Sequence, residues 1–502
     1  MPAPRQPFRS SSTSGRPSRG SNPSRGSNSS SGSSRRRPSN SVTSAPVRST
    51  LELALDAAAE VAAPESVPTF GQLGLPEVLV RTLARRGMES PFAIQVRALP
   101  DALAGRDVLG RGQTGSGKTL AFGLPLLTRL VGGTRRRSQP RALVLVPTRE
   151  LAQQVHDELA PLSQPLDLKV TTVYGGASMG RQIDQLRRGV DVVVATPGRL
   201  QDLVDQGECD LSLIEITVLD EADHMADLGF LPAVTKLLDL TPGDGQRLLF
   251  SATLDRGVDK LVHLFLKDPA MHAVASSSSP VEHMDHKVFA VTHSSKTDIA
   301  AEIAARPART LFFVRTKHGA DRLAIQLRKV GVEAAAIHGN LTQSARKRAL
   351  DDFTTGHARV LVATDVAARG IHVDDVDLVV HFDPPADHKD YLHRSGRTAR
   401  AGAKGTVLSL ILGDQVRDHQ RLRERAGVDA NAVAVVPGHP AVREVAESGE
   451  PIVVQPRIHG SSVGGNRRPG GPSGRPRRPG APTGRPRPGG PSSGSRPAPR
   501  PS

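Results

Sequence analysis

The chain has 502 residues, 37% of them apolar, and a formal net charge of +16. This length suits two or three domains rather than one. The single cysteine, Cys209, excludes an internal disulfide and a zinc site built from cysteines. No run of about 18 apolar residues could span a membrane, and the N-terminus lacks the apolar core of a signal peptide. We therefore expect a cytoplasmic protein without a membrane segment.

The positive charge lies at the two ends of the chain. Residues 1–50 contain nine Arg and residues 456–502 contain ten, with no acidic residue in either segment, so residues 51–455 carry a net charge of −3. Such basic segments favour a polyanion, either nucleic acid or an anionic membrane, although a purely solubilising role is the simpler alternative. Their Ser, Arg, Gly and Pro content predicts disordered tails at 1–66 and 456–502, with a short amphipathic helix of no assigned function at Leu51–Ala63.

Between the tails, short β-branched runs alternate with helix-like segments. Continuous apolar runs of this kind indicate parallel strands covered on both faces, and therefore two α/β halves. A flexible joint at 276–287 would separate a first domain at 67–275 from a second at 288–430, followed by a short extension at 431–455. The predicted strands are Leu143–Val146, Val170–Val173, Val190–Ala195, Ile216–Leu219, Arg247–Phe250, Leu311–Val314, Ala334–Ile337, Val360–Ala363, Leu378–His381 and Thr406–Leu412.

A complete phosphate-binding loop follows a short strand around Val108–Leu109 and opens a helix at Leu120. Glycines let backbone N–H groups curl around phosphates, and the helix N-terminus adds a positive dipole end. Lys118 should reach the β- and γ-phosphates of a nucleotide, and Thr119 should ligate Mg²⁺. The loop consists of Gly112, Gln113, Thr114, Gly115, Ser116, Gly117, Lys118 and Thr119.

An acidic cluster, Asp220 to Asp223, follows the apolar strand Ile216–Leu219. An Asp at a strand end suits a second contact to Mg²⁺, and the adjacent Glu221 can orient or deprotonate a water. An isolated acidic cluster after a strand is as often a solvated turn. The phosphate-binding loop upstream favours the catalytic interpretation.

At these residues the chain resembles the DEAD-box RNA helicases, bacterial members in particular. Asp220-Glu221-Ala222-Asp223 is the sequence after which that family is named, and the other family motifs follow in family order across about 69–412. The matching residues are Phe70, Gly87, Pro91 and Gln95; Pro147–Ala152; Gly175 and Gly176; Thr196–Arg199; Ser251–Thr253; Gln343 and Arg346; Ala363–Asp365; Ala368–Gly370; and His393–Arg400.

The resemblance implies two tandem RecA-like domains that close on ATP, Mg²⁺ and RNA. Gln95 would read adenine, and Arg397 and Arg400 would act as arginine fingers beside the catalytic Lys118, Asp220 and Glu221. Ser251 and Thr253 would couple hydrolysis to unwinding. The residues that would bind the RNA backbone are Thr148, Arg149, Gly176, Thr196, Arg199, Arg346 and Thr364. Because only 3% of the residues are aromatic, base-specific recognition is not expected.

The expected function is RNA-stimulated ATP hydrolysis that unwinds short RNA duplexes or remodels RNA–protein complexes. The expected form is a monomer, acting in ribosomal or RNA-decay assemblies. A DNA helicase with the same cleft and an RNA annealing scaffold that depends on its tails are the alternatives. Three positions depart from the family pattern: Met88 for an aromatic residue near adenine, His372 for an Asp near the ribose, and Ala399 for a Gly between the two fingers.

Overall fold

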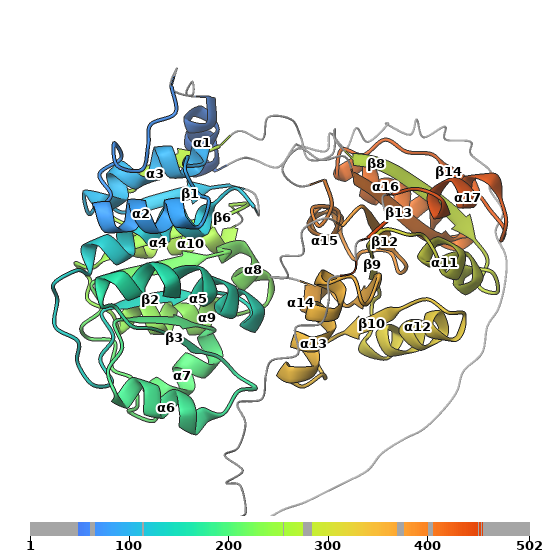
Figure 1. Cartoon of the computed structure of the whole chain (residues 1–502). Helices are drawn as coiled ribbons and strands as arrows, with labels where there is room; N and C mark the ends of the chain where they lie inside the picture. Colours follow the sequence, from blue (N-terminus) through green and yellow to red (C-terminus); the bar gives the residue numbers. More distant parts are fainter. Residues whose placement is uncertain are drawn as a thin grey trace, which may run out of the picture.

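The computed structural model describes residues 49–60, 66–112, 115–254, 256–274, 284–368, 376–399, 405–449, 451–452 and 454. Two α/β domains lie side by side, each with a parallel sheet between helices (Figure 1). None of the helices in these segments combines the length and the apolar character needed to cross a bilayer.

The first domain is a RecA-like unit around a seven-stranded sheet with the order β3-β4-β2-β5-β6-β1-β7. The central strands are buried along their whole length because helices cover both faces, which is why each of them contains a run of apolar residues. The strands are β1 (Val108–Arg111), β2 (Ala142–Leu145), β3 (Val170–Val173), β4 (Val192–Ala195), β5 (Ile216–Asp220), β6 (Gln246–Ser251) and β7 (Ala270–Ala273). The helices are α2 (Glu77–Arg85), α3 (Ala93–Leu103), α4 (Lys118–Arg129), α5 (Arg149–Ser163), α6 (Met179–Arg187), α7 (Pro197–Asp205), α8 (Ala222–Asp227), α9 (Leu231–Asp239) and α10 (Arg256–Phe265).

The second domain repeats this topology with the strand order β10-β11-β9-β12-β13-β8-β14. Each strand stands seven places after its counterpart in the first domain, so the two sheets are built in the same way. The strands are β8 (Met284–Val291), β9 (Thr310–Phe313), β10 (Ala334–Ile337), β11 (Val360–Ala363), β12 (Leu378–His381), β13 (Gly405–Leu412) and β14 (Ala432–Ala434). The helices are α11 (Lys296–Ala304), α12 (Lys317–Lys329), α13 (Gln343–Thr354), α14 (Asp365–Ala368), α15 (His388–Ser395), α16 (Val416–Arg425) and α17 (Pro440–Ala446).

The second domain extends beyond the predicted limits at both ends. β8 begins inside the segment 276–287 predicted as a linker, and β14 and α17 lie in the segment 431–455 predicted as an extension. β14 pairs with β8, and α17 buries Val442 and Val445 in the core of this domain. β8 is partly polar and β14 is short, so neither strand has a strong local signal in the sequence. Residues 275–283 lie outside the described segments.

Helix α1 (Thr50–Glu60) confirms the short amphipathic helix predicted at Leu51–Ala63, and it corrects the assignment of this part of 1–66 to a disordered tail. Ser49 and Glu52 form a capping box, with the Glu52 N–H donating to Ser49 Oγ at 3.2 Å and the Ser49 N–H donating to Glu52 Oε2 at 3.1 Å. Leu55 is fully buried against the first domain, and the Asp56 carboxylate lies 2.6 Å from Arg111 Nη2. These contacts order the amphipathic segment; residues 1–48 lie outside the described part of the chain.

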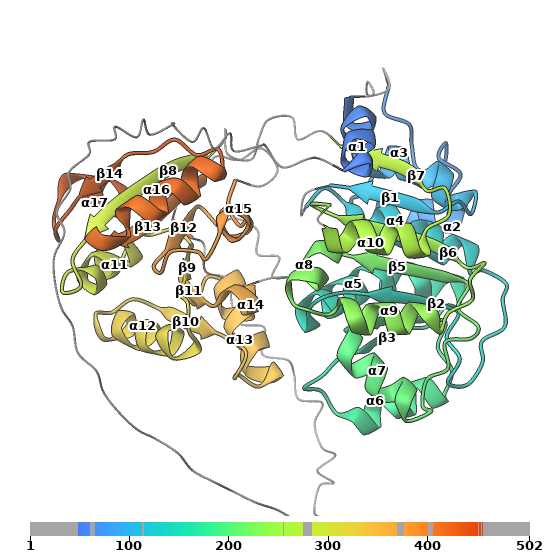
Figure 2. The ribbon, with the colours of Figure 1, turned by 180° about the vertical axis from the view of Figure 1, so that it is seen from behind.

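Helices that carry the motifs of both domains lie at the region between the domains (Figures 1 and 2). In both views, α8 lies on the side of the first domain that faces α13, α14 and α15 of the second (Figures 1 and 2). Motifs that follow different strands therefore meet there, as expected for open parallel sheets.

Candidate active site

The phosphate-binding loop joins β1 to α4, which begins at Lys118 with Thr119 as its second residue. Gly115 and Gly117 both have φ near +88°, a conformation that side-chain-bearing residues rarely adopt. The Gln95 side chain donates from Nε2 to the Gly117 carbonyl at 3.0 Å and accepts from the Phe92 N–H at 2.9 Å. A Cβ atom at Gly117 would lie 2.5 Å from Gln95 Nε2, so this approach requires glycine. Gln113 and Thr114 lie outside the described residues.

Lys118 and Glu221 form a buried ion pair, with 3.1 Å between Lys118 Nζ and Glu221 Oε1. Lys118 Nζ also donates to the Gly112 carbonyl at 2.7 Å. Burial alone would lower the pKa of Lys118, but the negative charges of Glu221 and Asp220 hold it above its usual value. Burial would likewise raise the pKa of Glu221, but Lys118, together with His224 and Arg397, lowers it. The carboxylate of Glu221 is therefore ionised at neutral pH.

Asp220 lies at the end of β5 and is 2% exposed. Burial and the adjacent charge of Glu221 raise the pKa of Asp220 to about 7. A nearby cation would favour the ionised form of this carboxyl group. Thr119 and Asp220 offer the oxygen ligands that Mg²⁺ prefers.

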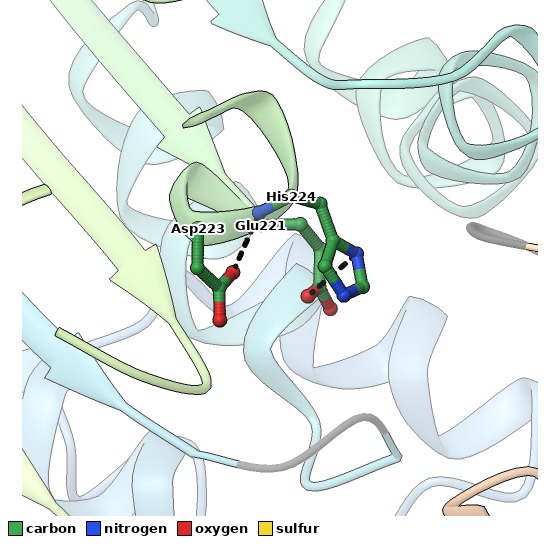
Figure 3. Close-up of side chains that lie close together, drawn as sticks. All are labelled: Glu221, Asp223 and His224. Carbon is green, nitrogen blue, oxygen red and sulfur yellow. Dashed lines mark hydrogen bonds and ion pairs between the residues drawn. The ribbon is translucent and has the colours of Figure 1, made fainter. Parts of the chain in front are cut away.

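Asp223 connects the acidic cluster to Ser251 and Thr253. Its Oδ2 accepts from the Thr253 N–H at 2.9 Å and from Thr253 Oγ1 at 2.8 Å, and its own N–H donates to Ser251 Oγ at 3.2 Å. Figure 3 shows Asp223 beside Glu221 and His224 at the start of α8. The sequence predicted no separate role for Asp223, although its place in the motif after which the family is named was a signal for one.

The residues predicted to bind RNA in the first domain follow β2, β3 and β4. Arg149 packs over Gly176 so closely that a Cβ atom there would clash with its guanidinium. Arg199 Nη1 donates to the Ala177 carbonyl at 3.4 Å. Thr148 and Thr196 are the N-cap residues of α5 and α7, and Thr148 Oγ1 accepts from the Leu151 N–H at 3.2 Å. The first-domain residues are thus brought together at one edge of the sheet.

The second domain reaches the first through Arg346 and Gln343 at the start of α13. Arg346 Nε donates to Glu150 Oε1 at 2.8 Å, and Gln343 Nε2 donates to the same oxygen at 3.0 Å. Arg346 and Glu150 are 6% and 8% exposed. Burial alone would raise the pKa of Glu150, but the hydrogen bond and charge of Arg346 lower it below its usual value, so the pair is ionised. Glu150 belongs to the motif Pro147–Ala152, but a sequence cannot show that its partner is 196 residues away.

The remaining second-domain residues surround the same interface. Thr364 follows β11, and its N–H donates to the Ile337 carbonyl at 3.3 Å. Arg397 is buried, donates from Nε to the His393 carbonyl at 3.3 Å, and contributes positive charge to the environment of Glu221. Ala399 has φ 54°, which explains why a glycine would fit better there and makes Ala399 a point of backbone strain. Arg400 and His372 lie outside the described residues.

Comparisons with known proteins agree with this geometry. Residues 92–261 match the DEAD/DEAH box helicase family, and residues 295–402 match the helicase conserved C-terminal domain. The chain is 42% identical over 346 residues to the RNA helicase CrhR of Synechocystis, covering 68% of this chain and 70% of that protein. It is 39% identical over 356 residues to the ATP-dependent RNA helicase DBP2 of Scheffersomyces stipitis, covering 69% of this chain and 67% of that protein.

A solved structure has a similar fold across both domains. Saccharomyces cerevisiae Dbp5 bound to RNA and ADP BeF3 matches with a TM-score of 0.66 and 29% identity, over 76% of this chain and 100% of that one. Maize chloroplast helicase 3A is 39% identical, but the chain spans only 52% of its length. Because the relatives come from a cyanobacterium, yeasts and plants, they do not single out a bacterial group. The chain belongs to the DEAD-box family of ATP-dependent RNA helicases.

Proposed function

We propose that this chain unwinds short RNA duplexes or remodels RNA–protein complexes by closing its two domains on ATP and RNA together. The observation that carries the proposal is the division of charged groups between the domains: Lys118 and Glu221 lie in the first, and Arg397 in the second contributes to the electrostatic environment of Glu221. Neither domain alone holds the whole set. ATP and RNA should therefore bind cooperatively, since each favours the closed arrangement.

In hydrolysis, Lys118 would bind the β- and γ-phosphates, and Gln95, held against the phosphate loop, would read adenine. Thr119 and Asp220 would hold Mg²⁺, which when bound neutralises phosphate charge. Glu221 would orient and deprotonate the attacking water, and Arg397 with Arg400 would stabilise the charge that develops on the transferred phosphoryl group. Asp223, through Ser251 and Thr253, would relay changes at this site to the rest of the domain.

For RNA, hydroxyl, guanidinium and backbone groups at loop tips suit phosphates and 2′-hydroxyls, which carry no base sequence. These groups are Thr148, Arg149, Gly176, Thr196 and Arg199 from the first domain, and Arg346 and Thr364 from the second. Arg346 already bridges the domains through Glu150, so it would link RNA binding to closure. We further propose that the protein works as a cytoplasmic monomer in ribosome assembly or RNA decay. With Cys209 as its single cysteine, the chain has no internal disulfide, as is usual for proteins of a reducing compartment.

The proposal is tested by measuring ATP turnover without nucleic acid, with single-stranded RNA, and with single-stranded DNA of the same sequence. We expect RNA to stimulate turnover, DNA to do so much less, and a short RNA duplex to separate only when ATP is present. Equal stimulation by RNA and DNA would instead support the DNA-helicase alternative. Strand separation or annealing that is unaffected by Lys118→Ala would support the scaffold alternative.

A further inference from the structure

His224 follows the acidic cluster directly and has no role in the proposed reaction. It is 3% exposed, and neither of its ring nitrogens has a hydrogen-bond partner among the described residues. Its Nδ1 lies 3.6 Å from Glu221 Oε2, which is too far for a hydrogen bond. Buried polar groups without partners are uncommon in folded proteins and call for an explanation such as a missing ion.

The ligand atoms of Glu221, Asp223 and His224 all lie within 4.8 Å of one another (Figure 3). Ligand bonds of about 2.0–2.1 Å place neighbouring ligands of a tetrahedral ion about 3.3 Å apart. The separation of 3.6 Å between Glu221 Oε2 and His224 Nδ1 is close to that value. Asp223 offers the third ligand atom within 4.8 Å of the other two: its Oδ1 accepts from the His224 N–H at 3.0 Å, and a carboxylate oxygen keeps a further lone pair for a cation.

The two oxygens of Glu221 face different partners. Oε1 lies 3.1 Å from Lys118 Nζ, whereas Oε2 faces the His224 ring and has no hydrogen-bond partner among the described residues. A cation at His224 could therefore use Oε2 without displacing Lys118. The ring of His393, from the second domain, meets the His224 ring edge-on with 4.8 Å between centroids, which places the site at the domain interface.

We propose that Glu221, Asp223 and His224 form an inhibitory binding site for a transition-metal dication such as Zn²⁺, separate from the site of the Mg²⁺ that accompanies ATP. An imidazole ligand favours Zn²⁺ and related ions, whereas Mg²⁺ prefers oxygen ligands in octahedral geometry. Occupation of the site fixes the Glu221 carboxylate as a ligand and removes the group that orients the attacking water. The inhibition rests on the proposed role of Glu221, whereas the metal binding does not.

Metal binding is tested with the full chain in the absence of nucleotide, using Co²⁺ as a spectroscopic substitute for Zn²⁺. We expect a visible absorption band that persists in excess Mg²⁺, is abolished by added Zn²⁺, and is lost in His224→Gln. The matched control is His263→Gln, since His263 is exposed on α10 and far from the acidic cluster in sequence. Glu221→Gln provides a second ligand variant, and thermal unfolding of each variant shows whether it is folded.

Inhibition is tested by titrating Zn²⁺ into the RNA-stimulated ATPase reaction at saturating Mg²⁺. The ATPase rate of each protein is expressed relative to its own rate without Zn²⁺. The Zn²⁺ concentration for half-inhibition should then be at least about tenfold higher in His224→Gln than in the wild type, and it should be unchanged in His263→Gln. The same Co²⁺ band in the wild type and in His224→Gln, or no band in either, would overturn the proposal and leave His224 as a packing partner of His393. A His224-dependent band without ATPase activity in any variant would refute the proposed function but not the metal site.

Discussion

The two domains place a lysine–carboxylate pair at the same point of the same fold, but only one pair belongs to a nucleotide site. Lys118 begins α4 after β1 and meets Glu221 after β5, at 3.1 Å. Lys296 begins α11 after β8 and meets Asp383 after β12, with 3.4 Å between Nζ and Oδ1. Because β8 and β12 are the counterparts of β1 and β5, the two pairs are equivalent by topology.

The difference lies in the turn that precedes each lysine. The first turn has glycines in left-handed conformations. The second, Thr292–Ser295, satisfies its own amides: the Thr292 N–H donates to Ser295 Oγ at 3.2 Å, and the Ser295 N–H donates to Thr292 Oγ1 at 3.2 Å. Burial lowers the pKa of Lys296 more than Asp383 restores it, whereas the acidic cluster raises that of Lys118. The same fold thus provides a phosphate site only where glycines and several acids accompany the lysine.

The carboxylates provide the strongest test of this comparison. Glu221→Gln should retain ATP binding and lower RNA-stimulated turnover by at least about 100-fold, because a general base of this kind contributes 10²–10⁴ in rate. Asp383→Asn, the topological counterpart, should leave turnover within about twofold, since it lacks a nucleotide partner. Single-turnover ATP hydrolysis measures both. Normal turnover in Glu221→Gln would show that its assigned role is wrong.

The lysines separate ATP binding from structural stability. Lys118→Ala should weaken ATP binding by about 10- to 100-fold, the effect of losing a charged hydrogen bond of about 1.5–3 kcal/mol. Lys296→Ala should leave the ATP affinity unchanged and affect only the stability of the second domain. Binding of a fluorescent ATP analogue, with thermal unfolding as the control, distinguishes the two effects. Equal losses of affinity in both variants would contradict the comparison.

The pair between the domains should matter for coupling rather than for chemistry. Arg346→Ala leaves Glu150 buried without its cation when the domains close. We expect the ratio of ATP affinities with and without RNA to fall by about tenfold, or about 1.4 kcal/mol. Arg348→Ala, an exposed arginine of the same helix, is the matched control and should keep the ratio. A ratio unchanged by Arg346→Ala would rule out the pair as a closure contact.

The stability of the second domain should also be the more sensitive to acid, because this domain buries three histidines around Tyr391. Tyr391 lies on α15, the helix that precedes Arg397. Burial lowers the pKa of His286 and of His419 to about 4, and that of His381 well below its usual value. The unfolded state then binds more protons between about pH 6.5 and 4. The free energy of unfolding should therefore fall as the pH falls through this window, by up to about 1.4 kcal/mol per pH unit for each histidine.

This pH dependence can be followed inside the second domain itself. The chain has no Trp and two Tyr, so in Tyr174→Phe the fluorescence of Tyr391 reports unfolding of the histidine cluster alone. Urea unfolding at pH 7.5, 6.5 and 5.5 should give midpoint urea concentrations that fall as the pH is lowered. His419→Phe should make this dependence of the midpoint on pH weaker. Midpoints that do not change with pH would mean that these histidines are accessible to protons in the folded state.

Much of the fold could be predicted because buried parallel strands carry their own signal. The runs at β2, β4 and β11 are apolar throughout and are buried along their whole length. β7, β8 and β14 were missed because strands at or next to the edge of a sheet have partly polar or exposed faces, and β14 is only three residues long. Helix α1 was placed in a tail because its order depends on Leu55 and Asp56 reaching the first domain.

The sequence by itself determined the chemical groups and their order, because loop glycines, strand runs and acidic clusters are local features set by side-chain type and spacing. It therefore predicted Lys118, Asp220 and Glu221 as catalytic residues, and it predicted two parallel sheets. Only the tertiary structure decided which side chains meet: the ion pairs of Glu150 with Arg346 and of Lys296 with Asp383, and the ring contact of His224 with His393. Such pairs join distant segments, and their energies depend on burial and distance, which no local pattern encodes.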